Sequence, residues 1–168
     1  MIAVADASPV CYLILIGEIE ILPQLLGRIL LPSEVLNELL ASGAPHNVRS
    51  WAAAPPHWVS VGTAPSASAA GLERLHAGER AAILLAESAK ADLVVLDDKH
   101  ARRIASERGL RVTGLLGLLV EAANRKLLDL PSAIERLAKT SFRCSPILLR
   151  SLLEHFERGS DERHKGTV

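Results

Sequence analysis

The segment DLVVLDD, residues 92–98, carries the strongest strand signal in the chain. Its centre is a short, continuous apolar run, which is typical of a strand that a parallel sheet buries on both faces. The run ends in two adjacent aspartates, so this strand delivers carboxylates at its carboxyl end. A second apolar run, IAVA at residues 2–5, ends in the same way at Asp6. The two segments together predict a parallel sheet with acids along one edge.

Helices and further strands alternate with these two segments. Ser8 and Pro9 suit the N-cap and first position of a helix, and Pro32 marks another helix start. The stretch 41–71 is rich in Pro and Gly and is expected to be mostly loop. We expect strands at 28–31, 58–61 and 110–112, and helices at 9–16, within 18–26, and at 32–40, 80–90, 99–108 and 114–126. This alternation predicts an α/β fold with helices on both faces of a parallel sheet.

All of these strands lie in a domain of residues 1–130. Beyond it the sequence predicts only helices, at 132–139 and 146–158, which would form a helical appendage of the same domain over residues 131–158. Residues 159–168 are polar and are expected to form a disordered tail.

The chain has 168 residues, of which 49% are hydrophobic and 3% aromatic, and its formal net charge is zero. This composition predicts a folded protein, not a uniformly basic nucleic-acid-binding protein, and it offers no aromatic platform for stacking bases. The zero net charge results from opposite net charges in two parts of the chain. Residues 1–98 hold 5 basic and 11 acidic side chains, a net charge of −6, whereas residues 99–168 hold 14 and 8, a net charge of +6. This split reflects either chance or a separation between an acidic site and a basic surface.

Cysteine usage and hydropathy favour a cytoplasmic protein. Cys11 and Cys144 form no CxxC motif and lie in apolar surroundings, which is typical of reduced thiols. No apolar stretch approaches the roughly 18 residues needed to span a membrane.

Five acidic residues are placed to meet at the carboxyl edge of the sheet, where open parallel sheets bind ligands. Asp6, Asp97 and Asp98 follow strands, whereas Glu38 and Glu79 lie on predicted helices. Glu79 could serve only the helix dipole, Glu38 could be an ordinary surface residue, and one of the adjacent aspartates could cap the next helix. Asp6 is different, because a carboxylate against an apolar strand is costly to bury without a partner.

Several carboxylates within a few ångströms cannot all ionise stably without a cation. Their hard oxygen ligands suit Mg²⁺ or Mn²⁺. The chemistry such a site predicts is metal-assisted hydrolysis of phosphodiester bonds. The six histidines show no HxH or HExxH spacing, and P-loop and GxSxG motifs are absent, so zinc, P-loop and serine-hydrolase chemistry are not expected.

Basic residues directly follow the second acidic pair. Lys99, Arg102 and Arg103 lie on the predicted helix 99–108 and are expected to bind RNA phosphates beside the metal. Arg102 could instead pair with Asp98, which lies four residues earlier on the same helix.

The order of these motifs resembles that of PIN-domain nucleases, and more narrowly their VapC-like prokaryotic branch. The resemblance lies in DASP at residues 6–9, in residues 32–38, in GERAAI at 78–83, and in LDD at 96–98 with the two arginines that follow. It implies a three-layer α/β/α sandwich with a central parallel sheet that cleaves RNA with Mg²⁺ or Mn²⁺. Carried over position by position, the catalytic metal ligands are Asp6, Glu38, Glu79 and Asp97, with Asp98 as a further ligand or a support and Ser8 as a holder of metal-bound water.

The resemblance also implies a homodimer and a cognate antitoxin protein, which would contact the apolar helices at residues 12–26 unless these are core. The sequence thus points to a metal-dependent endoribonuclease that is the toxin of a toxin-antitoxin pair. Two alternatives remain open. One is a degenerate PIN fold that binds RNA or a partner without catalysis, and the other is a receiver-like domain in which Asp6 or Asp97 accepts a phosphoryl group.

Overall fold

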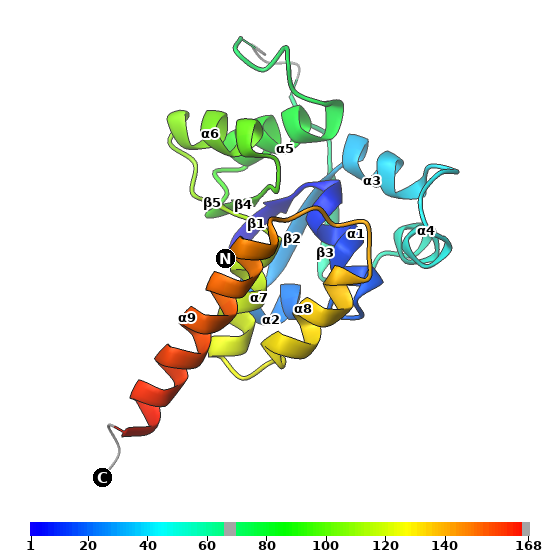
Figure 1. The fold of residues 1–168 in the computed structure, drawn as a ribbon. Coiled ribbons are helices and arrows are strands. Elements are labelled where there is room, and N and C mark those ends of the chain that lie inside the picture. The colour runs from blue at the N-terminus through cyan, green and yellow to red at the C-terminus, as the bar shows by residue number, and fades with distance from the viewer. Residues whose placement is uncertain (66–69, 166–168) are drawn as a thin grey trace.

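The central sheet is entirely parallel, with the strand order β3-β2-β1-β4-β5 (Figure 1). It is seen in a computed structural model that describes residues 1–65 and 70–165. Each strand segment that the sequence predicts is present in these residues. The strands are β1 (Ile2–Ala5), β2 (Arg28–Pro32), β3 (Val59–Gly62), β4 (Leu93–Val95) and β5 (Val112–Thr113).

The central strand β1 is buried on both faces of the sheet. Because side chains alternate along a strand, Ala3 and Ala5 belong to one apolar cluster and Val4 to another on the opposite face. The neighbouring strand β4 divides Val94 and Val95 between the same two clusters. The continuous apolar runs in the sequence therefore have a simple physical cause, since each alternate residue needs an apolar layer on its own side.

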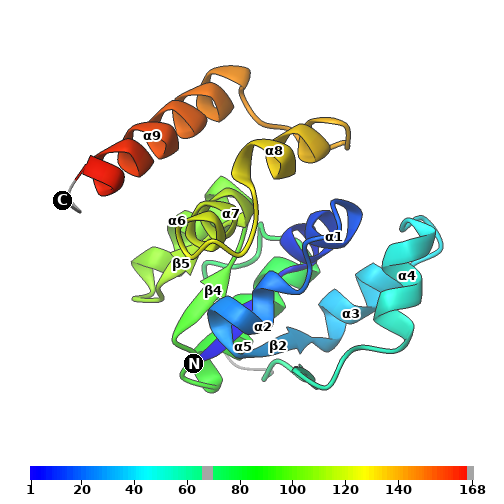
Figure 2. The same ribbon diagram turned by 90° about the horizontal axis from the view of Figure 1, so that it is seen from below.

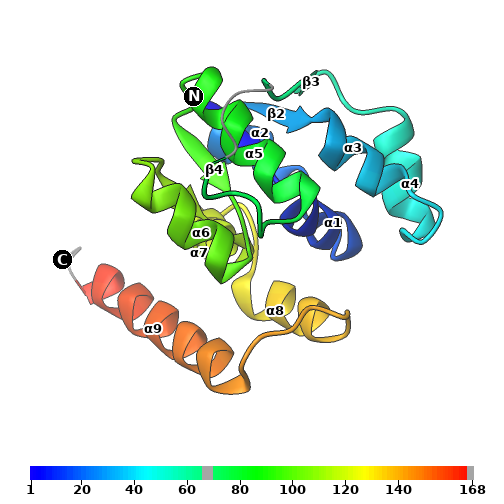
Figure 3. The ribbon, with the colours of Figure 1, turned by 90° about the horizontal axis from the view of Figure 1, so that it is seen from above.

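Helices supply these two layers (Figure 2 and Figure 3). The larger cluster includes buried residues of α1 (Ala7–Leu15), α2 (Ile21–Leu26), α3 (Ser33–Leu40), α4 (His46–Ala53), α7 (Leu115–Asn124) and α8 (Leu130–Ala138). The smaller cluster contains α5 (Ala77–Ser88) and α6 (Lys99–Glu107). The predicted three-layer α/β/α sandwich is confirmed. Within the described residues, no helix combines the length and the hydropathy needed to cross a membrane.

Helix α4 corrects the prediction of a loop over residues 41–71. Val48 and Ala52, one helical turn apart, are buried in the larger cluster. Trp51 packs on Trp58 with 6.0 Å between ring centroids. The prolines on either side delimit this short helix, although in the sequence alone such residues indicate irregular structure.

The chain ends in α9 (Pro146–Lys165), which extends away from the sandwich (Figure 1). Leu149, Leu152, Leu153 and Phe156 pack against the larger cluster, so the first part of this helix belongs to the domain. The helix continues to Lys165, beyond the end at residue 158 predicted for it. Residues 166–168 lie outside the described part of the chain.

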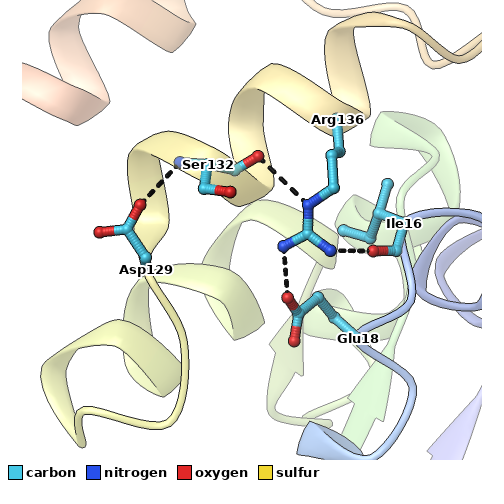
Figure 4. Close-up of polar contacts among 5 residues, drawn as sticks. All are labelled: Ile16, Glu18, Asp129, Ser132 and Arg136. Carbon is cyan, nitrogen blue, oxygen red and sulfur yellow. Dashed lines mark hydrogen bonds and ion pairs between the residues drawn. The ribbon is translucent and has the colours of Figure 1, made fainter.

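Helix α8 is fastened to the N-terminal part of the chain by Arg136. Its guanidinium donates hydrogen bonds to the carbonyl of Ile16 and to the carboxylate of Glu18, in the turn between α1 and α2 (Figure 4). The start of the same helix is capped by Asp129, whose carboxylate accepts a hydrogen bond from the Ser132 backbone at 3.0 Å. The C-terminal helices are thereby tied to the layer that covers β1.

We predict that Arg136→Ala lowers the free energy of unfolding by about 1–3 kcal/mol, because it leaves the largely buried Glu18 carboxylate and the Ile16 carbonyl without their partner. Urea denaturation measures this loss. The matched control is Lys139→Ala, which removes an exposed ion pair with Glu135 on the same helix and should change stability by less than about 0.5 kcal/mol. Equal effects of the two substitutions would contradict the structural role of Arg136.

Candidate metal-binding site

The ligand crevice expected of this sheet lies at the carboxyl ends of β1 and β4. The chain runs outward from β1 through β2 and β3 and then crosses to the other side of β1 to form β4 and β5. Such a reversal opens a crevice between the two central strands. Ala5 pairs with Val95 in the sheet. Asp6 and Asp97, which follow these two residues closely, therefore arrive at the same crevice from different strands.

Asp6 is the buried acid of this site. It is 6% exposed and is the one polar or charged residue among the fully buried positions of the described chain. Burial is the main cause that raises the pKa of Asp6 to about 7, while a hydrogen bond from the Ala7 backbone opposes the rise. The negative charges of Glu38, Glu79 and Asp97 also raise this pKa. The fold therefore brings Glu38, Glu79 and Asp97 close enough to Asp6 for their charges to act on it.

Glu38 meets Asp6 across Gly78, the second residue of α5. The Gly78 backbone N–H donates a hydrogen bond to Glu38 Oε1 at 3.0 Å. A Cβ atom on Gly78 would lie 2.6 Å from Glu38 Oε1 and 3.0 Å from Asp6 Oδ1. No side chain fits there without moving an acid, so Gly78, known from the sequence only as the first residue of the GERAAI motif, helps to position the acids.

Glu79 has a structural role in addition to its closeness to Asp6. Its Oε2 atom accepts a hydrogen bond from the His76 backbone N–H at 3.1 Å, which caps the start of α5. The side chain is only partly buried. The cap fixes where Glu79 stands relative to the crevice.

The adjacent aspartates divide into a cap and a pocket residue. Asp98 Oδ1 accepts a hydrogen bond from the Ala101 backbone at 2.8 Å and is the N-cap of α6. Asp97 Oδ1 accepts one from the Leu115 backbone at 2.8 Å, at the start of α7. Asp97 Oδ2 is buried and has no hydrogen-bond partner. Asp97 is thus the aspartate with a free oxygen in the crevice.

The Arg102 side chain lies beside Asp97, and no ion pair within the described residues joins it to Asp98, the alternative partner suggested by spacing. A Cβ atom on Gly114 would lie 2.7 Å from Arg102 Nη1 and 2.9 Å from Asp97 Oδ1. Burial raises the pKa of Asp97, and the Leu115 amide and the Arg102 charge oppose that rise. Arg102 therefore stabilises the charged form of this carboxylate.

The other predicted site residues lie around this core. Arg103 bonds along its own helix, to Glu107 at 3.1 Å and His100 at 3.3 Å, whereas Lys99 is exposed at the first position of α6. Ser8 lies in the first turn of α1, close to Asp6 in sequence, and is partly buried.

The carboxylate oxygens of this site are the kind of ligand that a hard cation prefers, although the carboxylates do not surround a cation in their present positions. In the described residues, no three acidic, histidine or cysteine side chains converge closely enough to hold a metal as they stand. Two observations nevertheless favour a cation here. Burial, and after it the like charges of the neighbouring acids, raise the pKa of Asp6, and Asp97 Oδ2 is a buried oxygen without a donor. Mg²⁺ and Mn²⁺ prefer such oxygen ligands and complete their coordination with water.

The comparison with known families agrees with this geometry. Residues 2–158 match the family DUF3368, described as a PIN domain. The chain belongs to the PIN-domain family. No curated protein and no solved structure matches the chain. The PIN domain is a nuclease-type fold, and its strand order here differs from the 2-1-3-4-5 order typical of receiver-like domains. The phosphoacceptor alternative therefore loses its support from the fold.

We predict that Gly78→Ala weakens Mn²⁺ binding by about 10- to 100-fold, because the new Cβ displaces the Glu38 and Asp6 carboxylates. Alanine is the better helix former, so a loss cannot come from a weaker α5. Isothermal titration with Mn²⁺ measures the effect in this PIN domain. Gly43→Ala, which adds a Cβ in open space, is the matched control and should leave the affinity unchanged. Equal affinities for the two variants would show that Gly78 does not hold the acids.

We also predict that the metal-free PIN domain loses stability as pH rises from about 4 to about 7. In this window native Asp6 keeps a proton that the unfolded chain, with its ordinary pKa near 3.8, has released. Its contribution is fully present below pH 3.8 and is lost as pH rises through about 7. Asp6→Asn should remove a dependence on the order of 2–4 kcal/mol, measured by urea denaturation in EDTA. Parallel pH profiles for the two proteins would contradict this.

Proposed function

We propose that this PIN domain is a divalent-metal-dependent endoribonuclease, which hydrolyses phosphodiester bonds in RNA with Mg²⁺ or Mn²⁺. The observation that carries the proposal is the buried Asp6, whose pKa is raised to about 7 with Glu38, Glu79 and Asp97 among the causes. A fold does not keep a buried carboxylate against three like charges without cost. A bound cation would neutralise the buried carboxylate and offset this cost.

Each acid has a distinct part in the proposed site. Asp6 and the free Oδ2 of Asp97 provide oxygens from the two central strands, and Glu38 adds a third from α3, held by the Gly78 N–H. The bound metal would lower the pKa of a water and neutralise charge on the phosphate. Glu79, held by the His76 backbone, contributes charge or orients water at the rim. Asp98 is assigned to the cap of α6 and not to the metal.

The start of α6 supplies the cations for an RNA backbone. Lys99 and Arg102 are exposed and lie within one turn of Asp97 and Asp98. An arginine beside a metal ligand can contact a phosphate that the metal also contacts. Arg103 can join them only by giving up its bond to Glu107. We therefore propose that Lys99 and Arg102 contact RNA phosphates next to the cleaved bond and that Arg103 lies further from that bond.

The role as a cytoplasmic toxin with an antitoxin and a homodimeric state is also a proposal. It derives from the resemblance to the VapC-like branch. The helices at residues 12–26 offer few apolar residues to such an antitoxin, because Leu13, Ile16, Leu22 and Leu25 are buried in the core. A short antitoxin reading frame directly upstream would support the toxin role over a housekeeping nuclease.

A catalytically inactive, binding-only PIN fold is the second candidate. The observation that favours it is the lack of three converging metal-binding side chains among the described residues. Titration with Mn²⁺ separates the two candidates, because a degenerate site should bind the ion no better in the wild-type protein than in Asp6→Asn.

Loss of a side chain that only orients a metal ligand typically costs ~10- to 100-fold in activity. We predict that Asp6→Asn reduces Mn²⁺-dependent cleavage of single-stranded RNA by more than this. The reason is that the amide removes the charge at the buried centre of the site. Gel analysis of a labelled RNA measures cleavage, and circular dichroism checks the fold. Asp98→Asn is the matched control, since asparagine also caps helices and should leave cleavage within a few-fold. Undiminished cleavage by folded Asp6→Asn would refute the assignment.

A further inference from the structure

A second pocket lies next to the acids, on the same edge of the sheet. It has a volume of about 290 Å³ and is bounded by α3, by α5 and by the chain that follows β3. Glu34 lines it one helical turn before Glu38, and Arg80 lines it shortly after Gly78. The two helices that form the Glu38–Gly78 contact, α3 and α5 (Figure 3), therefore also both contribute residues to this pocket.

The walls of the pocket are apolar apart from two opposite charges. Ala77, Ala81 and Leu84 form one side along α5, and Ala64 and Pro65 form another. Such a surface suits the flat face of a planar ring. The volume lies at the lower limit of typical ligand pockets, which fits a single ring system better than a whole nucleotide.

Glu34 and Arg80 provide the polar groups of the pocket, and both are partly buried. Glu34 Oε2 accepts a hydrogen bond from the Ser33 hydroxyl at 3.0 Å. In residues 1–65 and 70–165, no ion pair joins Glu34 to Arg80. A carboxylate, which can accept hydrogen bonds, and a guanidinium, which can donate them, therefore both line the pocket without pairing with each other.

Guanine is the base whose edge matches this pair. Its O6 and N7 are adjacent acceptors, which arginine binds in a bidentate manner. Its N1–H and N2 amino group are adjacent donors, which a carboxylate can accept together. Adenine places a donor beside N7, and cytosine offers a carboxylate one donor group where guanine offers two.

We propose that this pocket binds the guanine base of the nucleotide beside the cleaved phosphodiester bond. The inference rests on the proposed function, because it takes the neighbouring acids as the place where the phosphate is cut. Arg80 binds O6 and N7, Glu34 accepts from N1–H and the amino group, and the apolar residues of α5 pack against the ring. Recognition by a pocket of this kind needs no aromatic residue, which suits a chain with 3% aromatics.

The first test compares cleavage of single-stranded RNAs that differ at one position, with G, A, C or U beside the cut. Wild-type protein with Mn²⁺ should prefer G by roughly ten-fold or more, the order expected for a bidentate base contact. Arg80→Ala should reduce this ratio to about one. Arg80→Lys keeps the positive charge but loses the paired N–H donors of the guanidinium, so it should reduce the ratio as well. Replacing guanine by 7-deazaguanine should slow the wild type and leave Arg80→Ala unaffected.

Two further variants make the test specific. Glu34→Gln should abolish discrimination between guanine and inosine, which lacks the amino group, without a change in the shape of the pocket. Arg125→Ala is the matched loss of one positive charge, because Arg125 lines a different pocket together with Met1 and Leu93 at the amino ends of β1 and β4. It should retain the preference for G.

Binding to Asp6→Asn separates failure of the pocket from failure of the nuclease proposal. Fluorescence anisotropy with the same four RNAs should show a preference for G that the double variant Asp6→Asn, Arg80→Ala lacks. If this preference appears but no cleavage is found in the wild type, the pocket stands and the nuclease proposal fails. Equal affinities for the four RNAs, no binding, or a G preference that survives Arg80→Ala would overturn the pocket.

Discussion

The constraint on which this structure depends is a carboxylate buried at the end of its central strand. β1 contributes to both apolar layers, so the chain leaving it cannot reach water at once, and Asp6 remains 6% exposed. The group can be kept neutral by a proton or balanced by a cation. The first solution operates up to a pH near 7, where the native Asp6 titrates. The second gives a metal ion an affinity for the folded chain that the unfolded chain does not share, so a bound cation would stabilise the whole domain.

The opposite charges of the two halves of the chain have only a partial structural meaning. Arg102 does lie against Asp97, where the acidic half of the sequence meets the basic half. Other cations of the same segment serve the fold. Arg108 forms a two-pronged ion pair with Glu87 at 2.7 and 2.9 Å, which joins the end of α6 to α5. The separation of a metal pocket from an RNA-holding surface therefore rests on the start of α6, not on the net charge of the whole segment.

Strands, layers and acids could be predicted from the sequence because each depends on a local pattern. A buried strand requires a continuous apolar run, and a parallel sheet brings the ends of its strands to one edge. The local pattern indicated that one of Asp97 and Asp98 caps the next helix, but not which one, because that depends on which backbone amides the two carboxylates meet. The sequence did not show why Gly78 and Gly114 matter either, although Gly78 begins the GERAAI motif. Their importance comes from acids that lie far away in sequence and approach within 3.0 Å of where a Cβ would stand.

The pair of helices α3 and α5 links the proposed base pocket to the proposed metal site. Glu38 and Glu34 lie on the same side of α3, one turn apart, and Gly78 and Arg80 are close together at the start of α5. A shift of one helix against the other would break the Glu38–Gly78 hydrogen bond and open the pocket at the same time. A base held by Glu34 and Arg80 would in turn fix the distance between its own phosphate and the acids, since both are carried by rigid helices. A side-chain substitution can therefore change the base preference without changing the metal site, or the reverse. A movement of these helices would change both.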